Sequence, residues 1–225
     1  MASYLVTGVA RGLGLEIVKT LARKPGSEVS TVFATLRSSP PPAFLAAAVR
    51  QVKERLDGRS LDILINNAAV NELSPGGLET RDNLRRTLEV NVEAVHNVIL
   101  AFLPLLREGN LKTVLNMSSI TGSLAHAERF TIAPLPAYKN NKGGAKLHDQ
   151  AICTRPERSR IYVLCIFTRY QGGPYADLEA ETGAKAVLDL SRDREALNGK
   201  FLNIHVPGWE ETQGLHKYDE LEIEW

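Results

Sequence analysis

Cysteine is scarce in this chain: Cys153 and Cys165 are the only two among 225 residues, so neither a disulfide framework nor a metal site is expected. The chain also has no large excess of positive or negative charge, because 27 basic and 26 acidic residues leave a formal net charge of +1. This balance gives no support for binding to nucleic acid or to an anionic membrane. No apolar run approaches the length of a membrane span, and the chain opens with a strand pattern instead of a signal peptide. We therefore expect a cytoplasmic protein.

Short apolar strands alternate with helices along the whole chain. The strands are expected at residues 4–7, 29–36, 61–65, 113–116, 161–166 and 200–204. The helices are expected at residues 13–23, 43–56, 81–106, 138–152 and 181–190. This alternation predicts a doubly wound α/β fold, with a mostly parallel sheet of about six strands and helices on both faces. We find no internal repeat and no dividing linker, so residues 1–225 are predicted to form one domain.

A glycine cluster, Gly8, Gly12 and Gly14, lies between the first expected strand and the first expected helix. Glycines at such a turn let the backbone bend sharply and approach a pyrophosphate, whose charge is stabilised by the helix N-terminus. A tight turn without a ligand is the alternative. The strand before and the helix after the cluster favour a nucleotide-binding role.

Tyr138 and Lys142 are four residues apart, which places them on one face of a helix. An ammonium group beside a phenol favours the phenolate and lowers the tyrosine pKa, so the pair could form a general acid at neutral pH. Taken alone, the pair more often represents two unrelated polar residues on a surface helix. Its context in the rest of the chain decides between the two interpretations.

The T-G-x-x-x-G-x-G spacing of the glycine turn resembles that of the short-chain dehydrogenase/reductase family. The family's other motifs follow in the family's order and cover nearly the whole chain: "INNAA" at 65–69, "LEVNVEAV" with Asn91, "NMSSITG" with Ser119, and the Y-x-x-x-K pair. The S-x-x-G pattern selects Ser119 over Ser118, because Gly122 lies three residues after Ser119. Softer similarities, such as "VFATLR" and the C-terminal "EIEW", resemble the branch of carbonyl reductases and fungal norsolorinic acid ketoreductases.

The resemblance implies an NADP(H)-dependent reductase acting on a small-molecule ketone or aldehyde. It implies that Tyr138 protonates the carbonyl oxygen, Ser119 holds that oxygen, Lys142 lowers the tyrosine pKa and binds the nicotinamide ribose, and Asn91 anchors a relay water. The residues implied to bind the cofactor are Gly8, Arg11, Gly12, Leu13, Gly14, Arg37, Asn67, Ala68, Tyr138 and Lys142. No metal is implied.

Cofactor choice is predicted from charge at the end of the second strand. A carboxylate there suits the ribose 2′-hydroxyl of NAD, whereas an arginine suits a 2′-phosphate. Here the strand ends without an acid, and Arg37 stands at that place, with Arg11 as a second basic residue in the glycine turn. Both favour NADP(H); the alternative is that both are solvated surface arginines.

Three features depart from the family pattern. Only residues 38–60 separate Arg37 from Leu61, too few for a helix, a strand and a second helix, so the family's third strand and its aspartate are expected to be missing. The family's P-G turn after the sixth strand is replaced by "CIFTRYQGGPY", where Thr168 is a weak substitute. Asn141 stands where serine is common before the lysine.

These departures keep a rival function open: a catalytically impaired member that acts as a nucleotide-binding or dimerising module. The resemblance also implies a homodimer or homotetramer assembled through the helices at 81–106 and 138–152. Ordinary packing of those helices on the sheet is nearly as well supported.

Overall fold

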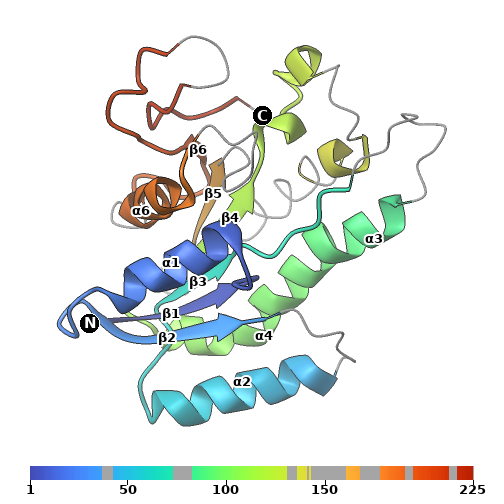
Figure 1. Ribbon diagram of the computed structural model, residues 1–225. Helices are drawn as coiled ribbons and strands as arrows, with labels where there is room; N and C mark the ends of the chain where they lie inside the picture. Colours follow the sequence, from blue (N-terminus) through green and yellow to red (C-terminus); the bar gives the residue numbers. More distant parts are fainter. Residues whose placement is uncertain are drawn as a thin grey trace.

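A computed structural model describes residues 1–36, 43–72, 83–130, 136–140, 142, 161–167, 178–190, 195–212 and 217–224. Within these ranges the chain forms a parallel sheet with helices on both faces (Figure 1). The strands are β1 (Ala2–Thr7), β2 (Val29–Thr35), β3 (Ile63–Asn66), β4 (Thr113–Ser118), β5 (Tyr162–Phe167) and β6 (Phe201–Asn203). The predicted doubly wound α/β fold is therefore confirmed.

The strands pair in the order β2-β1-β3-β4-β5-β6, and every pair of neighbouring strands in this order is parallel. The chain first moves from β1 to β2 on one side and then crosses to β3 on the other side of β1. Ligands of such sheets bind beyond the carboxyl ends of the strands at this reversal point. In the described part of the chain β2 is the edge strand, as the predicted absence of the family's third strand requires.

The helices follow the predicted positions closely. They are α1 (Gly12–Ala22), α2 (Ala43–Leu56), α3 (Leu84–Leu88), the π-helix η1 (Glu89–Glu93), α4 (Ala94–Glu108) and α6 (Ala180–Leu190). The helix predicted at 81–106 is thus a continuous run in three parts, with one π turn in its middle. Of the helix predicted at 138–152, residues 138–140 and 142 are described and are helical, as are residues 136 and 137 before it.

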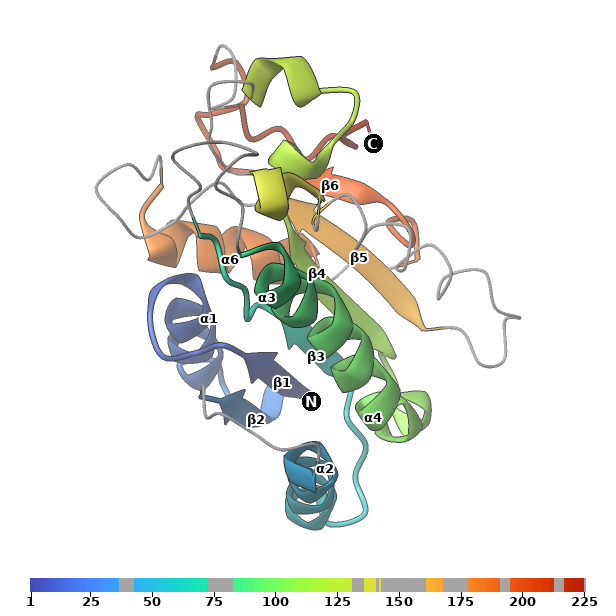
Figure 2. The same ribbon diagram turned by 90° about the vertical axis from the view of Figure 1, so that its right-hand side faces the viewer.

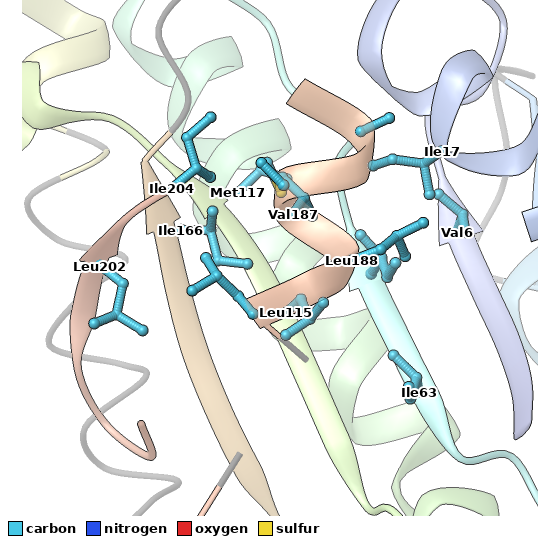
Figure 3. Close-up of a cluster of buried hydrophobic side chains, with 14 of the residues drawn as sticks. Val6, Ile17, Ile63, Leu115, Met117, Ile166, Val187, Leu188, Leu202 and Ile204 are labelled. Atoms are coloured by element: carbon cyan, nitrogen blue, oxygen red, sulfur yellow. The ribbon is translucent and has the colours of Figure 1, made fainter. Parts of the chain in front are cut away.

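Helices cover both faces of the sheet (Figures 1 and 2), and a cluster of hydrophobic side chains lies on each face. Neighbouring residues alternate between them: Val6 belongs to the cluster under α1 and α6, and Leu5 to the cluster under α2 and α4. This alternation follows from the two-residue period of a strand. Figure 3 shows the first cluster, in which α6 packs over side chains of the central strands. All four residues of β3 are buried, as expected for a central parallel strand.

Asp62, which is 4% exposed, joins neighbouring segments at the amino-terminal side of the sheet. Its carboxylate accepts hydrogen bonds from the backbone N–H groups of Ser3 (2.9 Å) and Asn110 (2.9 Å). The buried charge is therefore stabilised by donors from two distant segments, which fixes the sheet at the end away from the candidate site.

The run Leu84–Glu108 is long and apolar enough, by length and composition, to cross a membrane, so the expectation that no run reaches that length is wrong by this measure. Core helices pass the same test. Ile99, Phe102, Leu105 and Leu106 of this run are buried in the cluster under α2 and α4, and 22% of the apolar window is buried, so packing on the sheet accounts for part of the apolar composition.

Candidate active site

Tyr138 and Lys142 lie together, as their spacing predicts. The Lys142 ammonium is 5.6 Å from the centre of the Tyr138 ring. Lys142 is 5% exposed, and its Nζ donates a hydrogen bond of 2.7 Å to the carbonyl oxygen of Met117 in β4. A buried ammonium needs such an acceptor. The carbonyl thus holds the lysine at the carboxyl end of the sheet, facing the aromatic ring.

The electrostatics of Tyr138 differ from the prediction. Burial raises the pKa of Tyr138 to about 12, and a hydrogen bond with Ser119 acts in the opposite direction. The residue keeps some accessible surface, yet enough protein surrounds the hydroxyl for desolvation to dominate. The net direction is therefore opposite to the one expected for the protein without cofactor. The ammonium lies over the ring and donates to Met117, and the lowering of this pKa by Lys142 stays a prediction.

Ser119 follows β4 directly and lies at the N-terminus of the short 3-10 helix η2 (Ile120–Gly122). Its Oγ accepts the Thr121 N–H at 3.3 Å and lies 2.8 Å from the Thr121 hydroxyl. The same side chain hydrogen-bonds Tyr138. The neighbouring Ser118 Oγ is buried and has no hydrogen-bond partner among the described residues. This geometry supports the choice of Ser119 that the S-x-x-G pattern makes.

Asn91 lies in the π-helix η1 and is 1% exposed. Its Oδ1 accepts the N–H of Val70, and its Nδ2 donates to the carbonyl of Val70, both at 2.9 Å. π turns inside helices frequently occur at functional sites. Here the oxygen and the nitrogen of the Asn91 side-chain amide both attach the segment after β3 to the helix. The role of Asn91 in anchoring a relay water stays a prediction.

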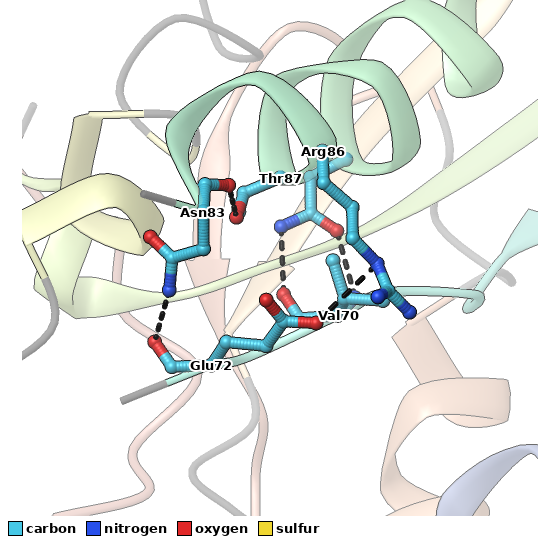
Figure 4. Close-up of polar contacts among 6 residues, drawn as sticks. Val70, Glu72, Asn83, Arg86 and Thr87 are labelled. Carbon is cyan, nitrogen blue, oxygen red and sulfur yellow. Dashed lines mark hydrogen bonds and ion pairs between the residues drawn. The ribbon is translucent and has the colours of Figure 1, made fainter. Parts of the chain in front are cut away.

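Further contacts hold the same segment against the start of the helix (Figure 4). Asn83 Nδ2 donates to the carbonyl oxygen of Glu72 at 3.3 Å, while the Glu72 carboxylate lies 3.4 Å from Nε of Arg86. Thr87 donates its hydroxyl to the carbonyl of Asn83 at 2.6 Å. The chain after β3 is thereby fixed over the helix that carries Asn91.

The glycine turn packs against the "NNAA" turn at the reversal point of the sheet. Gly8 has φ +72°, and a Cβ there would lie 2.7 Å from Cα of Ala68. A Cβ on Gly14 would collide with the Asn67 side-chain amide, which donates at 3.0 Å to the carbonyls of Thr7 and Gly8. These two glycines are thus required by the contact between the two turns, in addition to any approach of a pyrophosphate.

The N-terminus of α1 has the features of an anion site. Arg11 occupies the N-cap position with extended backbone, and its side chain makes no capping hydrogen bond. Gly12 has φ +59°, and Gly12, Leu13 and Gly14 form the first turn. No acidic side chain lies in this turn, so its N–H groups and the helix dipole favour a negative ligand.

Thr7 is a site residue that the predictions omitted. Its hydroxyl oxygen accepts the backbone N–H groups of Asn67 and Ala68, each at 3.1 Å. One side chain therefore joins the end of β1 to the turn after β3. The signal was present, because the threonine precedes Gly8 in the T-G-x-x-x-G-x-G pattern.

Arg37 and Thr168 lie outside the described residues, so their expected contacts with the 2′-phosphate and the nicotinamide stay predictions. A cavity of about 270 Å³ lies elsewhere, between α6 and the segments at 205–207 and 220. None of the four predicted catalytic residues lines it, and we do not assign it to the substrate. Within the described ranges, no group of three or more His, Cys, Asp or Glu side chains is arranged to hold a metal ion.

Comparison with known proteins finds relatives that are described as short-chain dehydrogenases. A family model described as short chain dehydrogenase matches residues 31–170, more than half of the chain, including Asn91, Ser119, Tyr138 and Lys142. The short-chain dehydrogenase/reductase AacuF of Aspergillus aculeatus is 34% identical over 179 residues, which are 65% of this chain and 65% of that protein. The short-chain dehydrogenase anuI of Penicillium roqueforti is 28% identical over 218 residues, covering 82% and 86% of the two chains.

Two solved structures share the fold. An NADPH-bound carbonyl reductase from chicken fatty liver superposes with a TM-score of 0.81 at 20% identity, covering 100% of this chain and 99% of that one. The carbonyl reductase Sniffer of Drosophila melanogaster superposes with a TM-score of 0.80 at 22% identity, covering 100% of both chains. At these identities the similarity shows the fold alone.

Proposed function

Because this chain belongs to the short-chain dehydrogenase/reductase family, we propose that it is an NADP(H)-dependent reductase of ketones or aldehydes. The observation that carries the proposal is the contact among three side chains at the carboxyl end of β4. Ser119 hydrogen-bonds Tyr138, and the Lys142 ammonium lies 5.6 Å from the ring of Tyr138. A hydroxyl, a phenol and a cation so placed can bind a carbonyl oxygen and protonate it.

The cofactor fits the observed turns. The first turn of α1, with Gly12, Leu13 and Gly14, offers uncapped N–H groups to the pyrophosphate. Gly8, Asn67 and Ala68 form the adjoining wall at the reversal point of the sheet. Arg11 is exposed beside this turn and, together with Arg37, is assigned to the 2′-phosphate. When bound, NADPH supplies the hydride for the carbonyl carbon.

The chain's own residues then bind, orient and protonate the substrate. Ser119 donates its hydroxyl to the carbonyl oxygen and holds it near Tyr138. The Tyr138 O–H transfers its proton to that oxygen as negative charge develops there. Lys142 holds a positive charge at the ring face, which stabilises the phenolate left behind, and it binds the nicotinamide ribose. Asn91 anchors the water through which the proton is replaced.

The rival proposal is a family member that binds a nucleotide or a second copy without turnover. One observation favours it: β2 is the edge of the described sheet, so the adenine side of the cofactor loses the support of a neighbouring strand. Binding of NADPH without oxidation of it, across a broad carbonyl panel, would select this alternative.

For partners and location, we propose a small carbonyl compound as substrate, a second copy of the chain as partner, and the cytoplasm as compartment. The balanced charge supports this assignment, since it gives no attraction to nucleic acid or anionic lipid. Fractionation of the native host, followed by detection of the protein in the membrane pellet, would contradict it.

The test is a titration of NADPH by intrinsic fluorescence, followed by turnover with a panel of ketones and aldehydes. Tyr138→Phe removes one hydroxyl and should reduce kcat at least ~100-fold, the scale of a lost general acid. The matched control is Tyr162→Phe at the far end of β5, where the hydroxyl lies 3.3 Å from Glu195. Equal turnover in the parent and Tyr138→Phe would remove Tyr138 from the mechanism.

A further inference from the structure

The end of the chain runs beside β6 and then reaches the loop of Ser119. We define residues 217–224 as the C-terminal strap. It pairs in the antiparallel sense with β6 through the bridge Leu202–Glu222, and with the segment after β6 through the bridge His205–Asp219. Figures 1 and 2 both show the chain end beside the short helical turns that follow β4. The sequence patterns predicted no element in this region.

The strap is firmly attached to the sheet. The backbone N–H of Ile223 donates to Phe201 at 2.7 Å, and that of Val206 donates to Tyr218 at 3.1 Å. Tyr218 is fully buried, Ile223 is 8% exposed, and both belong to the cluster that contains Met117. The strap is therefore packed into the same core as the carbonyl group that holds Lys142.

Among the described residues, a hydrogen bond joins the strap to the turn that follows Ser119. Ser123 donates its hydroxyl to the carbonyl oxygen of Glu224 at 2.6 Å, across 101 positions of sequence. Ser123 is 2% exposed and its N–H donates to Ile120 at 2.9 Å, which closes the turn that begins at Ser119. Because η2 contains only Ile120–Gly122, Ser119 and Ser123 flank the two ends of one short turn.

We propose that Ser123 and the C-terminal strap position Ser119 for the reduction. The strap fixes the far end of the turn, and the turn fixes the Ser119 hydroxyl beside Tyr138. Ser123 is a positioning residue, since it acts through Ser119 and touches neither substrate nor cofactor in this assignment. The inference rests on the proposed function and adds a residue pair, Ser123 and Glu224, to its machinery.

The test compares Ser123→Ala, a chain that ends at Ile223, and the two changes combined. Each single change removes one half of the same hydrogen bond, and Ser123→Ala also removes the acceptor of the His126 N–H at 3.3 Å. We expect each to lower kcat roughly tenfold with the KM for NADPH unchanged, because a small misplacement of a catalytic group slows the chemical step. The combined variant should be no slower than the slower of the two single variants, since the hydrogen bond that couples them is lost only once.

Two controls separate positioning from general damage. Ser123→Thr keeps the hydroxyl and should restore at least half of the parent kcat. Ser30→Ala removes a similar serine, whose hydroxyl donates to the carbonyl of Ala2 at 3.2 Å far from the site, and should leave kcat unchanged. Parent-like kcat in Ser123→Ala, or additive losses in the combined variant, would overturn the proposal.

Amide hydrogen exchange tests the attachment without requiring turnover. Residues 120–123 should exchange faster in Ser123→Ala and in the shortened chain, while β1 and α1 keep the parent rates. Unchanged exchange at 120–123 would refute the attachment itself. An inactive parent with faster exchange in the variants would instead refute the proposed function, and the catalytic role of the strap with it.

Discussion

Lys142 lies 5.6 Å from the ring centre of Tyr138, yet its Nζ hydrogen bond is made to the carbonyl of Met117. The lysine therefore holds its charge near the ring, while burial controls the hydroxyl and raises the pKa of Tyr138 to about 12. In this arrangement the phenol is neutral and carries the proton that the reduction needs. Without cofactor, Tyr138 is a weak acid, and the proposed proton transfer requires a stronger interaction between its hydroxyl and the Lys142 ammonium.

The titration of Tyr138 follows from this relationship. A folded-state pKa of about 12 lies above the ordinary 10.0, so the stabilisation of the neutral phenol is complete below about pH 10 and is lost as pH rises towards about 12. The ultraviolet phenolate absorbance of the parent minus that of Tyr138→Phe should stay flat to about pH 10 without cofactor. A rise centred near neutral pH would contradict this expectation. Tyr162→Phe serves as the control for the loss of a tyrosine hydroxyl elsewhere in the sheet.

Much of the fold could be predicted because strand and helix patterns are local. The alternation of Leu5 and Val6 between the two faces, and the stop of α1 near Pro25, depend on residues close in sequence. The strap at 217–224 could not be predicted in this way. Its pairing with β6 uses backbone groups that any residue carries, and its anchor Tyr218 is one residue without periodic neighbours.

The candidate site shows the same division. Family motifs selected Ser119, Tyr138 and Lys142, and the structure brings these three together. The pKa of Tyr138 was predicted in the wrong direction because sequence spacing reports neither burial nor the direction of an ammonium. The bond from Ser123 to Glu224 was missed because it joins positions 101 residues apart.

Cofactor preference should depend on the charge at the end of β2. Arg37→Asp should shift the preference from NADP(H) towards NAD(H), because a charge-assisted contact with the 2′-phosphate becomes a repulsion. The measurement is the ratio of kcat/KM for the two cofactors, with Arg55→Asp on the exposed side of α2 as the matched control. An unchanged ratio would assign the contact with the 2′-phosphate to Arg11 instead, and Arg11→Asp would then be the next experiment.

Assembly should depend on the apolar residues of α4 that the sheet does not cover. Leu100 is 52% exposed, whereas Ile99 and Phe102 are buried beneath the same helix. We expect a dimer or tetramer by light scattering at micromolar concentration, and a smaller species for Leu100→Lys, because the charge would enter the interface. Leu124→Lys is the control, since Leu124 is 86% exposed and lies outside this helix. A monomeric parent would refute the assignment.

Cofactor affinity should be weakened by the position of β2 at the edge of the described sheet. The adenine side loses one wall and the hydrogen bond of the family's missing aspartate. A lost hydrogen bond costs about 0.5–1.5 kcal/mol, and lost apolar burial adds ~25 cal/mol per Å². At about 1.4 kcal/mol per tenfold, these losses together weaken NADPH by roughly one to two orders of magnitude.

The contacts at the N-terminus of α1 do not depend on that wall. The N–H groups of Gly12, Leu13 and Gly14, and the charges of Arg11 and Arg37, should still hold the phosphates. We therefore expect weak but measurable NADPH binding by calorimetry, accompanied by low turnover. A sub-micromolar dissociation constant would show that another segment has replaced the wall. Failure to bind at millimolar NADPH would instead favour the non-catalytic alternative, because intact phosphate contacts would then have produced no affinity.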